Sequence, residues 1–193
     1  MVALRLVTLD ARTAGGDRHA LARRIAEARA DVACVHHAPS LLRWRSICAA
    51  LGREAGLVTV TGGRTGGGAL LLSSLGVSLG NTRDLTFGVG HGLRPAGAAV
   101  ASLSRLDHPF VLAGARLDPD RARQGGQVAA LQRAVDRVDP ARPPAILCVC
   151  DAGSAAAVTL QDGRTAAGSG VFVDPRITVS RQAGGVLELT LPG

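Results

Sequence analysis

The hydrophobic positions of this chain fall mainly into short, nearly continuous apolar runs, which predict β-strands. Such runs occupy residues 3–9, 32–35, 57–61, 69–72, 98–103, 110–117, 145–150, 171–173, 177–179 and 186–191. Weaker runs at 76–79 and 85–89 indicate two further strands. Runs with few interrupting polar residues are typical of strands that are buried on both faces.

Three longer stretches place their apolar residues at helical spacing instead. The first, residues 19–29, follows Asp17, whose side chain can cap a helix. The second, residues 41–55, ends at Gly56, a residue type that commonly terminates helices. The third, residues 120–138, runs into a proline-rich stretch that stops it. These patterns predict three helices among many strands.

The order of the predicted elements argues against one doubly wound sheet, in which strands and helices would alternate throughout. Here a β-α-β-α segment precedes a group of strands, followed by a β-α-β segment and more strands. The pattern favours two strand-rich halves, each covered by helices. The chain of 193 residues has no repeat or linker that would divide it, so we expect one domain over residues 1–193.

Composition narrows the class of protein. Hydrophobic residues make up 47% of the chain, which is enough for a sizeable core and argues against disorder. No apolar run reaches the roughly 18 residues that a membrane-spanning helix needs, so no membrane partner is expected. The first ten residues read as a strand rather than as a signal peptide. We therefore expect a cytoplasmic protein.

The chain is basic, with 22 basic and 15 acidic residues and a formal net charge of +7. Every basic residue is Arg, Tyr is absent, and Asn81 is the single Asn, a bias typical of a GC-rich coding sequence. The Arg residues are scattered and are not interleaved with aromatic residues that could stack on bases. The charge permits a phosphate-bearing partner, including nucleic acid, without requiring one.

Four cysteines are too few to form a disulfide framework in a chain of this length. Cys148 and Cys150 lie two residues apart in an apolar run and would share one face of a strand. A metal site made by this pair is one reading. We favour the interpretation that Cys148 and Cys150 are buried small apolar residues.

Three of the predicted strands end in polar groups that could form a site. Asp10 follows the first run, His36 and His37 follow the second, and Asp151 follows the run at 145–150. Sites gather at strand ends in layered α/β folds, so Asp10, His37 and Asp151 could form a carboxylate and imidazole cluster. The alternative is that they only begin loops.

The order of several short motifs resembles that of the endonuclease/exonuclease/phosphatase superfamily, in particular its short members from GC-rich bacteria. The resemblance covers nearly the whole chain. It is carried by Leu9-Asp10, the segment 31–37, Ala115-Arg116-Leu117, Arg121 with Gln124, Cys150-Asp151-Ala152-Gly153, Val171-Phe172-Val173 and the segment 180–185. The resemblance implies a four-layer α/β/β/α sandwich with two mixed β-sheets. It also implies a hydrolase, a phosphodiesterase, nuclease or phosphatase that uses Mg²⁺ or Mn²⁺.

The residues that the family uses to hold metal and phosphate are mostly replaced here. Where the family has a metal-binding Glu, this chain has His37, whose nitrogen suits a transition metal better than Mg²⁺. The family's two phosphate-orienting Asn residues correspond to Asp10 and Gly153. Asp151 is retained, and by resemblance would help to activate the attacking water.

The family's two catalytic His residues correspond to Arg116 and Gln182, and the Asp that orients one of them corresponds to Arg181. Arg116 can bind phosphate through two hydrogen bonds but cannot exchange a proton at neutral pH. Gln182 can donate a hydrogen bond but cannot titrate. Arg116 and Arg181 could together make a basic pocket that binds substrate.

Three hypotheses follow. The first is a degenerate family member, a pseudoenzyme that is weak or inactive as a catalyst and acts as a binding module, with no certain cofactor. The second is an active phosphodiesterase or nuclease with a rebuilt site, in which Asp10, His37 and Asp151 hold a divalent metal. The third is a nucleic-acid-binding protein that uses its Arg charge. The sequence does not indicate an oligomeric state.

Overall fold

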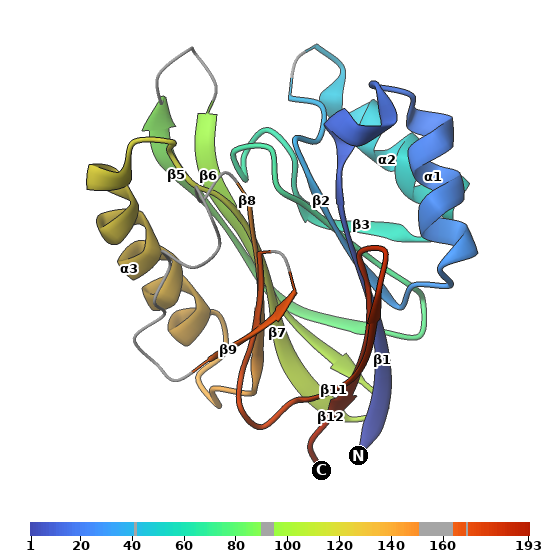
Figure 1. The fold of residues 1–193 in the computed structure, drawn as a ribbon, viewed down its shortest axis with the longest axis vertical. Helices are drawn as coiled ribbons and strands as arrows, with labels where there is room; N and C mark the ends of the chain where they lie inside the picture. The colour runs from blue at the N-terminus through green and yellow to red at the C-terminus, as the bar shows by residue number, and fades with distance from the viewer. Residues whose placement is uncertain (41, 90–94, 151–163, 169) are drawn as a thin grey trace.

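A computed structural model describes residues 1–40, 42–89, 95–150, 164–168 and 170–193. These residues form two six-stranded sheets, which face each other in the middle of the molecule (Figure 1). The first sheet has the order β11-β12-β1-β2-β4-β3, and the second has the order β5-β6-β7-β8-β10-β9. The strands of the first sheet are β1 (Val2–Asp10), β2 (Val32–His36), β3 (Val58–Gly62), β4 (Leu70–Ser73), β11 (Thr178–Ala183) and β12 (Val186–Leu191). Those of the second are β5 (Ser78–Val89), β6 (Pro95–Arg105), β7 (His108–Arg116), β8 (Ala145–Cys150), β9 (Thr165–Gly168) and β10 (Val171–Val173).

Each sheet contains one parallel strand pair within otherwise antiparallel neighbours. In the first sheet β1 runs parallel to β2 and pairs Asp10 with His36. In the second sheet β7 runs parallel to β8 and pairs Arg116 with Cys150. Both sheets are therefore mixed, as the resemblance implied.

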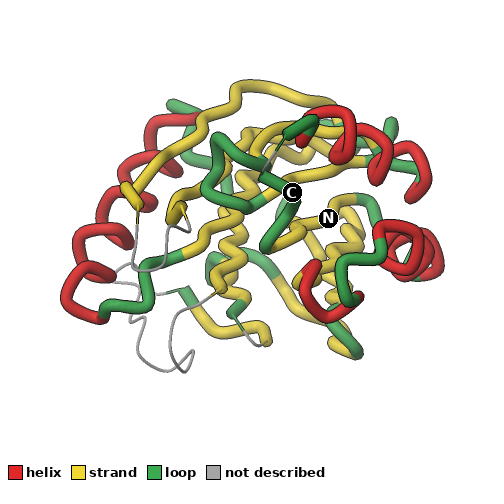
Figure 2. Tube along the Cα trace, turned by 90° about the horizontal axis from the view of Figure 1, so that it is seen from above, coloured by secondary structure: helices red, strands yellow, loops and turns green. Residues whose placement is uncertain are grey.

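Helices cover the outer face of each sheet. Helices α1 (Arg18–Glu27) and α2 (Trp44–Ala55) lie on the first sheet, and α3 (Arg121–Val138) lies on the second (Figures 1 and 2). One apolar cluster fills the space between the sheets, including Leu6 and Leu112, and two further clusters join the helices to the sheets. The predicted four-layer α/β/β/α sandwich is confirmed.

The predicted helix boundaries have clear causes. Asp17 accepts a hydrogen bond from the backbone nitrogen of His19 at 2.8 Å and caps α1. Asp120 caps α3 in the same way, through Ala122 at 3.0 Å. Gly56, with a φ of 72°, ends α2. Helix α2 begins at Trp44 rather than at residue 41, because Arg43 before it has a left-handed backbone with φ of 61°.

Two strands differ from the prediction. The runs at 76–79 and 85–89 belong largely to one long strand, β5, whose middle is polar and which pairs with β6 through the backbone. Strand β9 is short and consists of Thr, Ala, Ala and Gly, so its side chains gave no strand pattern. Both elements are edge strands, which depend least on apolar side chains.

None of the helices in the part of the chain that the structure describes is long and apolar enough to cross a membrane.

Candidate functional site

The ends of the two parallel strand pairs meet on one side of the sandwich. Asp10 ends β1 beside the end of β2, and Arg116 ends β7 in the facing sheet. Gly68, in the glycine-rich turn before β4, lies between the two sheets at this point. A Cβ atom built on Gly68 would lie 3.7 Å from the Cα of His37 and 3.9 Å from Nη1 of Arg116. The structure thus brings Asp10, His37 and Arg116 into one region.

Asp10 and His37 form a hydrogen-bonded pair. The Nδ1 atom of His37 lies 3.1 Å from Oδ1 of Asp10, and the His37 side chain is only 7% exposed. A carboxylate can only accept a hydrogen bond, so Nδ1 is the nitrogen that carries the proton when Asp10 is ionised. The pair therefore fixes both the ring orientation and the tautomer of His37.

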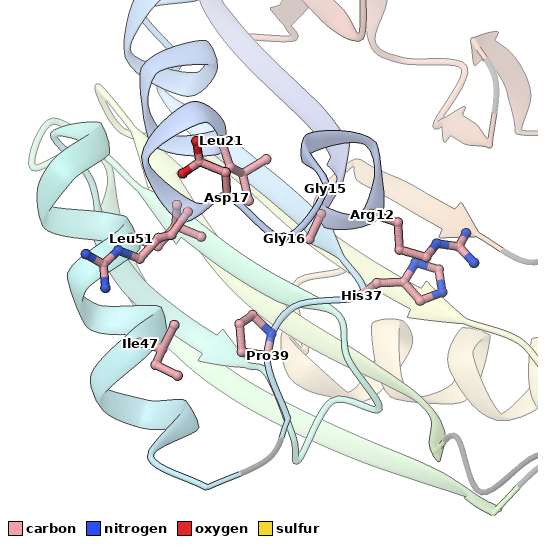
Figure 3. A pocket seen from close by; sticks show the side chains of 11 residues that line it. Arg12, Gly15, Gly16, Asp17, Leu21, His37, Pro39, Ile47 and Leu51 are labelled. Carbon is pink, nitrogen blue, oxygen red and sulfur yellow. The ribbon is translucent and has the colours of Figure 1, made fainter.

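Arg12 holds the same carboxylate from the other side. Its Nη2 and Nε atoms lie 2.7 and 3.0 Å from Oδ2 of Asp10, and its backbone nitrogen donates to Oδ1 at 2.9 Å. The last bond also caps the short 3₁₀ helix η1 (Ala11–Ala14). Figure 3 shows the Arg12 guanidinium beside the ring of His37. Asp10 thus anchors two basic side chains.

The environment of Asp10 keeps it ionised. Partial burial acts to raise its pKa, but the hydrogen bonds from the side chain and backbone of Arg12, with the charges of His37 and Arg12, outweigh that effect. The pKa of Asp10 consequently lies below its ordinary value of 3.8. At neutral pH the carboxylate is charged, and its oxygens are used as hydrogen-bond acceptors.

His37 reaches this position through an uncommon backbone conformation. Its φ is 53°, in the left-handed region that few residues other than Gly adopt, although His, Asn and Asp are enriched there. The preceding residue, His36, follows the regular alternation of β2, is buried, and places Nε2 3.7 Å from the sulfur of Cys34. The left-handed backbone of His37 therefore places its side chain beside Asp10, whereas the side chain of His36 lies near Cys34.

Thiols lie beneath the site, in the core between the sheets. Cys34 from the first sheet and Cys148 from the second are both fully buried. A hydrogen bond with Cys148, burial, and the nearby Cys148 and Cys150 raise the pKa of the Cys34 thiol well above its ordinary value. Cys148 and Cys150 share a face, as predicted. Cys148 is a buried small residue, as expected, whereas Cys150 is partly exposed.

The described residues do not fit the Mg²⁺ or Mn²⁺ that the resemblance implies. Those cations prefer several oxygen ligands, whereas the oxygens of Asp10 already accept from Arg12 and His37. Among the residues that the structure describes, no three His, Cys, Asp or Glu side chains are placed to share a metal ion. Asp151 and Gly153, and with them the third member of the predicted cluster, lie outside the described residues.

Arg181 and Gln182 lie away from this region. Both are on the edge strand β11, where Arg181 pairs with Glu188 and Gln182 pairs with Leu187. Leu187 pairs in turn with Leu6. Leu6 lies four residues before Asp10 on β1, which is a distance of roughly 13 Å along the strand. Arg181 lines a separate pocket of about 240 Å³ with Arg5 and Glu188.

A tight hairpin explains that placement. Gly184 and Gly185 both have positive φ and close the turn between β11 and β12. The carbonyl of Gly185 accepts from the backbone nitrogen of Thr8 at 2.9 Å, so the turn ends below the level of Asp10. The basic pocket expected from Arg116 and Arg181 together is therefore not formed.

The sequence pattern did not single out Arg12 or Gly68. Arg12 follows Asp10 by two residues, and no spacing rule distinguishes it from the other scattered Arg residues. Gly68 is one of several glycines in its turn, and its role depends on a contact between sheets. A bidentate Arg–carboxylate pair at the end of a strand could have been sought as a pattern in its own right.

No protein-family model matches this chain, and no curated protein matches it. Solved structures do match. An endonuclease/exonuclease/phosphatase family protein from Bacteroides thetaiotaomicron aligns with a TM-score of 0.72 at 12% identity, over 97% of each chain. A mannosyl-6-phosphatase from the same species aligns with a TM-score of 0.72 at 10% identity, over 97% of this chain and 99% of that one. TDP2 of D. rerio, in complex with a single-strand DNA product, aligns with a TM-score of 0.73 at 10% identity, over 98% of this chain and 100% of that one.

Proposed function

Because this chain has the fold of the endonuclease/exonuclease/phosphatase superfamily, we propose that it binds a phosphate-bearing ligand at the Asp10, His37 and Arg116 region. The same region is a degenerate catalytic site, which does not support metal-dependent hydrolysis of phosphate esters at an appreciable rate. The protein acts as a binding module on a hydrolase fold.

One observation carries this proposal: the carboxylate of Asp10 is used by Arg12 and His37. Three hydrogen-bonding groups converge on it at 2.7 to 3.1 Å. A metal ion would have to displace Arg12 or His37 to reach these oxygens. An acidic residue surrounded in this way serves to position cations of the protein.

The positive charge around Asp10 favours an anionic ligand. Arg12 has a side chain that is 52% exposed, and Arg116 is buried with its guanidinium near Gly68. Arg side chains bind phosphate oxygens through pairs of charge-assisted hydrogen bonds. Among the solved structures that share the fold, one is named a phosphatase and one holds a DNA product, which agrees with a phosphate-bearing ligand.

A second candidate function rests on the His37–Asp10 hydrogen bond. A carboxylate that accepts from one ring nitrogen orients an imidazole and makes its other nitrogen a better metal ligand or base. An active phosphodiesterase or nuclease would use this pair with Asp151 and a transition metal. Protein purified without chelator would then contain about one equivalent of zinc, manganese or iron. Metal contents well below that would overturn this candidate.

Two assays test the main proposal. In the first, bis(p-nitrophenyl) phosphate and p-nitrophenyl phosphate are incubated with the protein and Mg²⁺ or Mn²⁺, and the expected release equals that of buffer with metal. In the second, binding of orthophosphate is followed by calorimetry. Arg12→Ala and Arg116→Ala should each weaken binding about tenfold, the loss of a charge-assisted hydrogen bond.

The matched control is Arg133→Ala, which removes the same charge from the exposed surface of α3 and should leave phosphate binding unchanged. Equal weakening by all three substitutions would mean that phosphate binding depends only on the net charge of the protein. That result would overturn the proposed site. Rapid turnover that disappears in Asp151→Ala would overturn the degenerate assignment.

A further inference from the structure

A cavity opens directly beside His37, on the helical side of the first sheet. It lies between η1, the start of α1 and α2, and has a volume of about 420 Å³ (Figure 3). Leu21, Pro39, Ile47 and Leu51 contribute its apolar wall. Cavities of this size and character are typical of small-molecule sites.

The cavity is built into the fold. Gly15 and Gly16 form one wall with positive φ, and a Cβ atom at either would meet nothing within 4 Å. The helices on both sides are tied together by Glu54 of α2, which pairs with Arg18 at 2.7 Å and His19 at 2.9 Å. The backbone of one turn therefore forms one side of the space, and an ion pair links the two helices that flank it.

The polar end of the cavity is shared with the site described above. Arg12 and His37 line the cavity and also contact Asp10. The other charged groups at the rim are already engaged: Arg18 pairs with Glu54, and Asp17 caps α1. A ligand that enters here meets Arg12 and His37 at one end and aliphatic side chains at the other.

We propose that this cavity takes the organic group of an aliphatic phosphomonoester whose phosphate lies at Arg12 and His37. This proposal rests on the proposed function and specifies its ligand class. Leu21, Pro39, Ile47 and Leu51 offer no side-chain hydrogen-bond donor or acceptor, so the hydroxyls of a sugar or the edges of a base would lose their hydrogen bonds to water. An alkyl or alicyclic group has no such loss and gains by leaving water.

The test is a homologous series of n-alkyl phosphates, from methyl to octyl, titrated into the unmodified protein by calorimetry. Each added methylene should strengthen binding about threefold until the cavity is filled. The corresponding alkan-1-ols, which lack the anion, should bind at least tenfold more weakly than the phosphates of equal length. This first test uses only the unmodified protein and so does not depend on the folding of a variant.

A variant then localises the effect. Ile47→Trp should fill the cavity, so that the dependence of affinity on chain length disappears. Leu75→Trp is the matched control, because Leu75 is 89% exposed in the turn after β4, away from the cavity. It should retain the full dependence on chain length.

The outcomes separate the two proposals. Binding of methyl phosphate without any gain from longer chains would overturn the cavity assignment and leave the proposed function in place. Absence of binding for every phosphate would overturn the proposed function as well. Equal affinity for octanol and octyl phosphate would overturn the placement of the phosphate at Arg12 and His37.

Discussion

His37 donates a hydrogen bond from Nδ1 to Oδ1 of Asp10 over 3.1 Å, joining the ends of two neighbouring parallel strands of the first sheet. The same carboxylate binds Arg12. One acidic side chain therefore fixes the positions of an imidazole and a guanidinium at the ends of two neighbouring strands.

The first prediction concerns the pH dependence of stability. Asp10→Asn keeps a side chain that can cap η1 but removes the charge that attracts Arg12 and His37. Because the pKa of Asp10 is lowered in the folded protein, its charge stabilises the fold above about pH 4, and this stabilisation is lost as pH falls through the folded pKa. The unfolding free energies of the parent and Asp10→Asn should differ at pH 7 and converge below pH 4. Asp107→Asn, which removes one carboxylate from an exposed turn, is measured alongside as the control.

The second prediction concerns metal binding. His37→Asp replaces a ring nitrogen by oxygens beside the carboxylate of Asp10, and oxygen ligands favour Mn²⁺. We expect the variant to bind Mn²⁺ at least tenfold more tightly than the parent, measured by electron paramagnetic resonance of the free ion. Equal affinities would show that the imidazole is not what disfavours the hard cation.

The third prediction concerns the contact between the sheets beneath the site. A Cβ atom on Gly114 would lie 2.6 Å from the sulfur of Cys34. Gly114→Ala should lower the unfolding free energy by about 1–3 kcal/mol through overpacking. Cys34→Ala removes the opposing sulfur, so the double variant should lose less than the two single losses combined, by about 1 kcal/mol. Urea unfolding of the four proteins measures this coupling, and strict additivity would contradict it.

The fourth prediction uses a glycine without such a contact. Gly125 lies inside α3, and a Cβ atom there would meet nothing within 4 Å. Gly125→Ala should raise the unfolding free energy by about 0.5–1 kcal/mol, because Ala loses less backbone entropy in a helix. Thermal unfolding checks the sign, and a loss of stability would mean that α3 needs the flexibility of Gly125.

The fifth prediction concerns thiol reactivity. Burial raises the pKa of Cys48 to about 11, Cys34 is raised as well, and Cys148 is fully buried, whereas Cys150 is partly exposed. Since the thiolate is the reactive form, iodoacetamide at pH 8 should modify Cys150 much faster than the other three. Peptide mass spectrometry over time identifies the modified residue. Cys150→Ser should remove the fast phase, and Cys48→Ala should retain it.

Much of the fold could be predicted because the core strands consist of nearly continuous apolar residues. The run at residues 145–150 is continuously apolar, and it forms β8 with the predicted bounds. The capping residue Asp17 correctly predicted the start of α1. Prediction was weakest at sheet edges, where β5 and β9 are held by backbone pairing rather than by apolar side chains.

The site could be predicted in part. Residues at strand ends, such as Asp10 and Arg116, are placed by topology, and the expectation that strand ends converge applies to them. Arg181 and Gln182 were assigned from the order of motifs, but the length of a hairpin decides where they lie, and Gly184 and Gly185 make that hairpin short. Arg12 follows Asp10 by two residues, but the three-dimensional geometry decides that this Arg, among the many in the chain, binds the carboxylate.

The left-handed backbone of His37 also bears on how this protein can change by mutation. Of the residues that could supply an oxygen ligand, Asp and Asn tolerate a φ of 53° far better than Glu does. In the genetic code, one base change converts a His codon to Asp or Asn, whereas Glu requires two. Both the backbone and the code therefore lead from His37 towards a short side chain, and an oxygen ligand would arise here most readily as Asp rather than as Glu.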